Sequence, residues 1–275
     1  MESVVRTAAV LVVLALFAAN GHAAEPVTST HSKALRGQTW DSIKRLPDWT
    51  GVWAPSRPAA PPRNGGVGGK GFVFGGDVPL KPKYAAMRDE RMAAVRGDRG
   101  RDKIPLSNSG LCLPTGTPAN MGPVGHEYLF SPGRVTILLE NSEIRRIWTD
   151  GRPHVPDDLV NPSFSGDSIG HWEGDTLVVD TINIFPEAEL FIGGRVTAQT
   201  HVIERITRVG NRMRIDTVVE DPELFTKNWV YTRWYDHEDG PPIDYNSCTE
   251  GDRAKKGEQT LLDIDFAPPK EGQQK

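Results

Sequence analysis

The sequence predicts a mainly β fold, an antiparallel barrel or strongly curled sheet, with one amphipathic helix and long N-terminal loops. From residue 126 onward, the chain consists of short β-prone runs, and most connections between them are short turns rich in Gly, Pro, Asn or Ser. Short connections favour antiparallel neighbours, and about eight such strands can close into a barrel that leaves no exposed edge. The predicted strands are residues 127–130, 135–140, 143–149, 168–172, 176–184, 200–209, 212–220 and 229–237.

The first 24 residues have the pattern of a secretory signal peptide. Arg6 precedes a short apolar run at 8–19, and small residues at 21–24 offer a cleavage site. The apolar run is too short to span a bilayer comfortably, although an uncleaved anchor is the alternative. We therefore expect a soluble periplasmic or secreted protein without membrane insertion.

The remaining chain divides into three expected parts. Residues 25–125 form an N-terminal extension with a first strand, loops and one helix, 126–250 form the antiparallel barrel core, and 251–275 form a flexible tail. The helix is expected at 81–96, where Tyr84, Met87, Met92 and Val95 have amphipathic spacing. A second, short helix is expected near 42–45.

The first strand begins with Gly51-Val52-Trp53, close to Trp49. Lipocalin-like barrels open similarly, with an indole closing one end of the barrel while glycine allows close backbone approach. The alternative is two core tryptophans on an ordinary first strand.

Charge and cysteine content narrow the function classes. The formal net charge is −4, with both signs mixed along the chain, which argues against nucleic acid as the main partner. The chain contains 2 cysteines, Cys112 and Cys248. Export and the even count predict one disulfide, with two buried thiols as the alternative, and two cysteines alone disfavour a zinc-finger site.

The densest group of potentially catalytic side chains surrounds a predicted hairpin at 167–181. In the loop before it, His154 is a candidate general base or acid, Asp150 its orienting partner, and Arg152 a stabiliser of negative charge. The alternative is a structural turn in which Asp150 caps backbone amides and Arg152 pairs with a neighbouring acid.

His171 and His201 are further catalytic candidates. They could approach each other across neighbouring strands and bind a metal together with Glu173, Asp175 or Glu204. Because no recognised metal-binding spacing occurs, we predict no metal and no cofactor.

The strand at 229–237 has an unusual aromatic face. Alternation places Trp229, Tyr231, Arg233 and Tyr235 on one side, where they could line a pocket for a planar or anionic ligand. The alternative is an outer face with exposed aromatic rings. Trp148 and Trp172, beside the candidate loop and hairpin, complete the predicted substrate-binding set.

Several motifs resemble an uncharacterised family of exported bacterial proteins. They are Trp-Thr-Gly-Val-Trp at 49–53, Cys-Leu-Pro at 112–114, the hairpin at 128–139, Trp-Thr-Asp-Gly-Arg-Pro-His at 148–154, Gly-His-Trp-Glu-Gly-Asp-Thr-Leu-Val-Val at 170–179, Glu-Arg at 204–205, Asp-Pro at 221–222 with Phe-Thr at 225–226 and Trp229, and Cys248. The resemblance covers nearly the whole mature chain and implies export and a shared site loop, but no reaction. In that family Arg or Lys commonly fills the place of His171, which argues against His171 as a family-wide catalyst but allows a specialised role for it here.

These patterns favour a cofactor-independent acid/base enzyme (a lyase, isomerase or hydratase) acting on a small, partly aromatic or hydrophobic molecule. The alternative is a non-catalytic binding protein of lipocalin type. In the pocket wall, a buried histidine in contact with a carboxylate would favour the enzyme, whereas a wall of aromatic side chains alone would favour the carrier. The sequence does not determine the oligomeric state.

Overall fold

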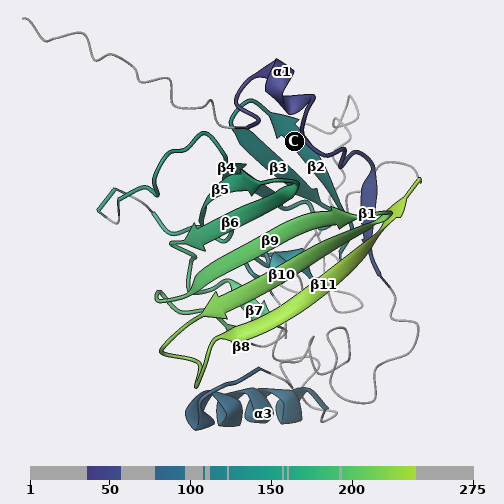
Figure 1. The fold of residues 1–275 in the computed structure, drawn as a ribbon. Helices are drawn as coiled ribbons and strands as arrows, with labels where there is room; N and C mark the ends of the chain where they lie inside the picture. The colour runs from purple at the N-terminus through teal and green to yellow at the C-terminus, as the bar shows by residue number, and fades with distance from the viewer. Residues whose placement is uncertain are drawn as a thin grey trace, which may run out of the picture. The chain divides into compact units, whose positions relative to one another are not determined.

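The structure is a computed structural model that describes residues 36–56, 78–96, 108, 112–122, 124–156, 158–159, 161–191 and 194–239. Nine strands close into a barrel in the order β1-β11-β10-β9-β6-β5-β4-β3-β2 (Figure 1). Their bounds are β1 (Val52–Pro55), β2 (His126–Ser131), β3 (Arg134–Leu139), β4 (Ile144–Trp148), β5 (Asp167–Glu173), β6 (Thr176–Ile182), β9 (His201–Val209), β10 (Arg212–Glu220) and β11 (Trp229–Glu238). The predicted mainly β fold and the closed barrel are confirmed.

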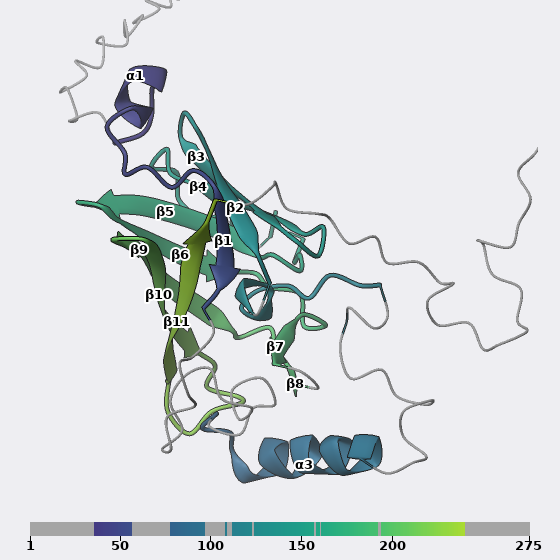
Figure 2. The ribbon, with the colours of Figure 1, turned by 90° about the vertical axis from the view of Figure 1, so that its right-hand side faces the viewer.

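The strand β1 closes the barrel (Figure 2). It pairs with β11 along its length and with β2 through Trp53 and His126. The strand that the sequence places in the N-terminal extension is therefore an integral part of the barrel. The predicted signal peptide and tail lie outside the described residues.

One strand pair departs from the predicted antiparallel arrangement. β4 and β5 run parallel, with Ile147 opposite Ser168. The connection between them, residues 149–166, is long enough to bring the chain back to the same end of the barrel before β5 begins. The sequence also missed the short hairpin of β7 (Glu189–Phe191) and β8 (Gly194–Arg195), which lies outside the barrel order and allows β6 to pair with β9.

Two short helical segments accompany the long predicted helix. α1 (Trp40–Ile43) begins slightly earlier than expected, because Thr39 and Ser42 form a reciprocal capping box at its start. α3 (Pro82–Arg96) confirms the long helix, and η2 (Ala119–Met121) is a single 3₁₀ turn. Among the described residues, no helix has the length and apolar character needed to cross a membrane.

The long helix α3 is fixed to the barrel domain at its first turn. The hydroxyl of Tyr84 donates a hydrogen bond to Glu223 (2.6 Å), and the Tyr84 ring packs against buried side chains. Met87, expected on the packing face, is 50% exposed. The side chains of Met92 and Val95 lie outside the described residues.

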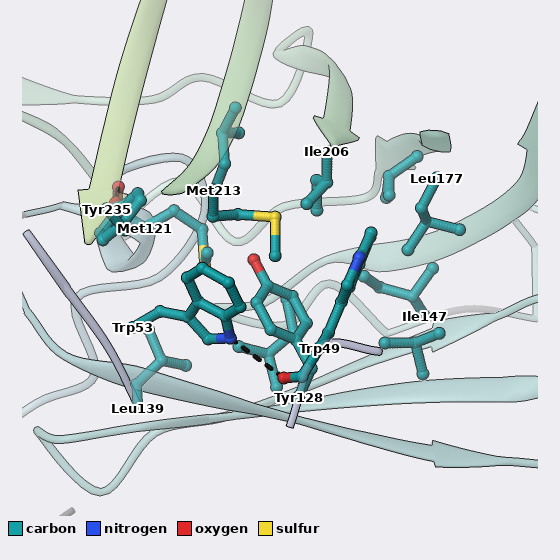
Figure 3. Packing of buried hydrophobic residues seen from close by; sticks show 14 residues of the cluster. Trp49, Trp53, Met121, Tyr128, Leu139, Ile147, Leu177, Ile206, Met213 and Tyr235 are labelled. Atoms are coloured by element: carbon teal, nitrogen blue, oxygen red, sulfur yellow. Dashed lines mark hydrogen bonds between the residues drawn. The ribbon is translucent and has the colours of Figure 1, made fainter. Parts of the chain in front are cut away.

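The inward side chains of the barrel form two apolar clusters. The first contains Trp49, Trp53, Tyr128 and Tyr235 among its aromatic members (Figure 3). Trp53 donates its indole N–H to the carbonyl of Trp49 (3.0 Å), so both tryptophans belong to the core. The second cluster contains Trp229 and Tyr231.

Between these clusters lies a polar layer. β10 shows the change along one strand, since Ile215 belongs to the first cluster, Thr217 is a buried polar residue and Val219 belongs to the second cluster. The other buried members of this layer are Arg145, Ser168, Thr181 and Glu204.

Candidate functional site

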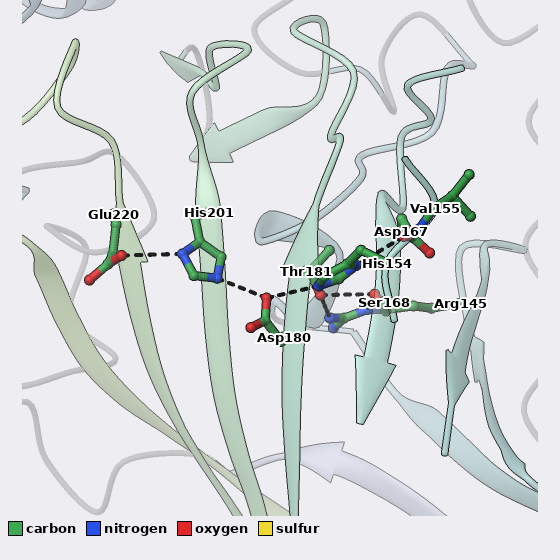
Figure 4. Close-up of polar contacts among 9 residues, drawn as sticks. All are labelled: Arg145, His154, Val155, Asp167, Ser168, Asp180, Thr181, His201 and Glu220. Carbon is green, nitrogen blue, oxygen red and sulfur yellow. Dashed lines mark hydrogen bonds and ion pairs between the residues drawn. The ribbon is translucent and has the colours of Figure 1, made fainter. Parts of the chain in front are cut away.

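A row of histidines and carboxylates crosses the outer face of the barrel. At its centre, Oδ1 of Asp180 lies 2.8 Å from Nε2 of His201 and 3.2 Å from Nε2 of His154 (Figure 4). Asp180 points outward from β6, because its neighbours Val179 and Thr181 are buried inside. One carboxylate is thus shared by two imidazoles.

The second nitrogen of each imidazole is also held by a carboxylate. Nδ1 of His154 lies 2.9 Å from Asp167, and Nδ1 of His201 lies 3.2 Å from Glu220. Asp167 also accepts the backbone N–H of Val155 (2.9 Å). These contacts fix the orientation of both rings, which is what a group that transfers protons requires.

Strand order brings these residues together. β5, β6, β9 and β10 are consecutive neighbours in the barrel and contribute Asp167, Asp180, His201 and Glu220. Glu220 is directly opposite His201 in the ladder. His154 comes instead from the connection between β4 and β5. We call these five residues the outer row.

Exposure varies along the outer row. The side chains of Asp167 and His154 are 10% and 20% exposed, whereas that of Asp180 is 44% exposed. The His154–Asp167 pair is therefore well shielded, while a small molecule can reach Asp180 from solvent. Shielding strengthens the electrostatic interaction within the pair.

The expected pairing of Asp150 with His154 is wrong. The side chain of Arg152 donates hydrogen bonds to both carboxylate oxygens of Asp150, from Nε (2.9 and 3.0 Å) and from NH2 (2.6 Å). Asp167 takes the place predicted for Asp150. The side-chain hydrogen bond from Arg152 lowers the pKa of the Asp150 carboxyl. The structural alternative for this turn is therefore the one that forms.

Arg152 nevertheless remains close to the outer row. Its guanidinium lies 3.9 Å from the ring centroid of Trp148, a cation–π contact on the outer face. The pKa of Arg152 is raised chiefly by its hydrogen bond with Asp150, with a further contribution from the charge of Asp167. A positive charge thus lies within electrostatic reach of the His154–Asp167 pair.

His171 is not part of the outer row. Its side chain is exposed and pairs with Glu173 (3.1 Å), which also accepts a hydrogen bond from Arg205 (2.8 Å). The pKa of Glu173 is lowered, first by Arg205 and then by His171. His171 and His201 therefore have separate partners. Within the part of the chain that the structure describes, no group of three or more His, Cys, Asp or Glu side chains could hold a metal ion.

The predicted aromatic face of β11 points into the barrel, so the alternative of exposed rings is wrong. Trp229 and Tyr231 are each 4% exposed and Tyr235 is 1% exposed. Burial raises the pKa of both tyrosines. Arg233 donates hydrogen bonds to the backbone carbonyls of Met121 and Pro118. These four residues lie on the opposite side of the barrel wall from His154 and cannot share one site with it. Trp172 also packs against the inner core.

The sequence prediction missed a buried ion pair. Arg145 of β4, 0% exposed, donates through NH2 to Glu204 of β9 and to Thr181 (2.9 Å), and its Nε donates to Ser168 (3.4 Å). Strand alternation could have revealed this pair. Arg145 is two residues from the buried Ile147 and Glu204 is two residues from the buried Ile206, so both side chains point into the barrel. The same reasoning could have placed Asp180 on the outer face.

No protein-family model, curated protein or solved structure matches this chain.

Proposed function

We propose that the protein is a cofactor-independent acid/base enzyme (a lyase, isomerase or hydratase) whose reacting groups belong to the outer row. The observation that supports this most is that His154 and His201 share Asp180 through Nε2, while Nδ1 of each ring contacts a second carboxylate. The feature expected of an enzyme was a buried histidine–carboxylate contact in a pocket wall, whereas the His154–Asp167 pair is 20% and 10% exposed and lies on the outer face. The proposed substrate is a small, partly aromatic or hydrophobic molecule.

His154 is the proposed general base. Asp167 holds Nδ1 of His154, so Nε2 is the nitrogen that can accept a proton. At 3.2 Å, the contact between Nε2 and Asp180 is one of the two longest of the four His–carboxylate contacts, the other being that of His201 with Glu220. A substrate would replace the His154–Asp180 contact. Asp180 would then stabilise the imidazolium that forms.

The remaining steps use the neighbouring groups. A proton removed from the carbon next to a carbonyl leaves negative charge on the carbonyl oxygen, and the proposed stabiliser of this charge is the guanidinium of Arg152, which interacts electrostatically with Asp167. His201 can return a proton to a second atom of the substrate, which completes an isomerisation or the loss of a leaving group. Trp148 offers an aromatic surface next to Arg152.

Hydrogen–deuterium exchange at carbon tests this proposal without knowledge of the substrate. The protein is incubated in D₂O with a panel of small aliphatic and aromatic carbonyl compounds, and deuterium incorporation next to the carbonyl is followed by NMR. At least one compound should exchange faster than in buffer. His154→Ala should reduce that rate by on the order of 10²–10⁴.

His171→Ala is the matched control, because His171 is an exposed histidine paired only with Glu173 among the described residues. Its exchange rate should equal that of the wild type. Equal losses in both variants, or no catalysed exchange across the panel, would count against acid/base chemistry in the outer row.

A non-catalytic carrier of lipocalin type is the second candidate. The inward aromatic face of β11 favours it, because such rings could contact a guest inside the barrel. Native mass spectrometry of the purified protein would support this candidate if it found a stoichiometric small molecule that dissociates on unfolding.

Export and the disulfide remain part of the proposal. Cys112 is described, whereas Cys248 and the signal peptide lie outside the described residues. We expect the mature protein to begin near residue 25 and to contain a Cys112–Cys248 bond. Two reactive thiols in the unfolded, unreduced protein would exclude that bond.

A further inference from the structure

The interior of the barrel contains buried hydrogen-bond donors that the fold leaves unused. They include Nε1 of Trp49 and NH1 of Arg145, with Nε1 of Trp172 next to Gly37, and none of these three has an acceptor within the described residues. Trp49 is 1% exposed and Arg145 is 0% exposed. A buried donor without an acceptor costs about 1–3 kcal/mol, so several in one interior indicate that something else supplies acceptors.

Two of these donors belong to one aromatic cluster. The ring of Trp49 lies 4.9 Å from Tyr128, 5.6 Å from Phe130 and 5.2 Å from Trp172, measured between centroids. Figure 3 shows the indole nitrogen of Trp49 on the side facing Ile206 and Leu177, away from its own backbone. Its surroundings are therefore aromatic and aliphatic.

The aromatic cluster borders the polar layer. Tyr128 interacts electrostatically with both Glu204 and Arg145, and burial raises its pKa well above the ordinary value. Along β9, Ile206 beside Trp49 is two residues from Glu204 on the same inward face. The Trp49 donor and the Arg145 donor thus belong to adjacent layers of one interior.

The charge balance of this interior disfavours an anionic guest. Glu204 already neutralises Arg145, and Tyr128 and Tyr235 are held in the neutral form by burial. His126, whose Nε2 lies 3.1 Å from the Tyr128 hydroxyl, is neutral as well, because burial lowers its pKa to about 3. An added carboxylate would face Glu204 in a desolvated space.

We propose that the barrel interior binds a small, neutral, mainly apolar molecule that carries a carbonyl-type acceptor. Its apolar part packs against this aromatic cluster on the side of Trp49 that faces Ile206 and Leu177. Its oxygen accepts the indole N–H of Trp49, and NH1 of Arg145 is the neighbouring donor in the next layer. This site goes beyond the proposed acid/base function, because it lies on the inner side of the wall whose outer side carries His154, and it specifies the ligand class of the carrier candidate.

Three probes of similar size test the proposal: acetophenone, ethylbenzene and benzoate. ¹⁵N-labelled full-length mature protein is titrated, and the indole N–H signals are followed by NMR, with Trp49 and Trp172 assigned from their Phe variants. Acetophenone should shift both signals saturably. Ethylbenzene, which lacks the acceptor, should bind about tenfold or more weakly, since one buried hydrogen bond is lost. Benzoate should bind no more tightly than ethylbenzene.

Trp49→Phe keeps one aromatic ring and removes the donor together with part of the indole volume, so acetophenone should bind about tenfold more weakly to it. Trp234→Phe is the control, because Trp234 lies on the outer face of β11, where the guanidinium of Arg212 is 4.5 Å from its ring centroid. This variant should bind acetophenone like the wild type.

The wild-type comparison of the probes remains decisive even if Trp49→Phe does not fold. The proposal fails if acetophenone causes no saturable shift, because water would then be the acceptor for these N–H groups. It also fails if ethylbenzene binds as tightly as acetophenone, if benzoate binds most tightly, or if folded Trp49→Phe binds like the wild type.

Discussion

The barrel wall formed by β5, β6 and β9 carries a polar network on each side, and the two networks differ in their contact with water. Asp167 and Asp180 point outward, while the next residues in the chain, Ser168 and Thr181, point inward. In the outer row the side chains of Asp180 and His201 are 44% and 30% exposed. In the inner layer those of Arg145 and Glu204 are 0% and 1% exposed.

Because of this difference, we expect the inner network to contribute to stability and the outer network to reactivity. A buried ion pair depends on both partners, because the loss of one leaves an uncompensated charge in a medium of low polarity. A partly exposed network can lose or exchange a partner at small cost, because water replaces it. We therefore assign the inner pair to the fold and the outer row to chemistry.

The largest expected effect is the loss of one member of the inner pair. Glu204→Ala leaves Arg145 buried without its counter-ion and should reduce the free energy of unfolding by about 3–5 kcal/mol. Chemical denaturation measures this loss. The double variant Arg145→Met, Glu204→Leu should recover most of it, because it removes both charges. An unaltered stability for Glu204→Ala would break the distinction between the two networks.

The second expected effect is a dependence of the free energy of unfolding on pH. Burial lowers the pKa of His126 from 6.5 to about 3, so the unfolded chain binds a proton below pH 6.5 that the folded chain does not bind. Stability should therefore fall on acidification, by about 1.5–2 kcal/mol between pH 6.5 and 5 from this residue. His126→Gln should flatten this part of the profile, whereas His171→Gln, at an exposed position, should leave it as in the wild type.

The smallest effect concerns the turn next to the outer row. The side chains of Arg152 and Asp150 are 45% and 32% exposed, so Arg152→Ala should change the unfolding free energy by less than about 1 kcal/mol. Because the folded pKa of Asp150 is lowered, this contribution is present above the ordinary value of 3.8 and is lost as the pH falls through the lower folded pKa. A large loss at neutral pH would mean that this pair supports the fold.

Strand alternation and turn residues were sufficient to predict the eight strands from β2 to β11 that belong to the barrel. They could not predict that β4 and β5 run parallel, because the long connection at 149–166 gives no local signal for the direction of the next strand. The hairpin β7–β8 was missed because its strands are very short.

The candidate site was predicted in part. His154 and His201 were singled out, but their carboxylate partners depend on strand neighbours that are distant in sequence, since His154 is 26 residues from Asp180. The turn residue Asp150 looked like the natural partner of His154 because it is close in sequence. Arg145 and Glu204, 59 residues apart, pair inside the barrel from β4 and β9, two strands that β5 and β6 separate in the strand order.

Two isosteric variants, one on each side of the wall, test the central claim most directly. Asp180→Asn and Glu204→Gln each remove one negative charge, and both are measured for deuterium exchange per folded molecule and for unfolding free energy. Asp180→Asn should lose on the order of 10²-fold or more of the exchange rate while its stability changes by less than about 1 kcal/mol. Glu204→Gln should lose at least about 2 kcal/mol of stability and keep its exchange rate. The reverse pattern, or the same pattern in both variants, would contradict the assignment.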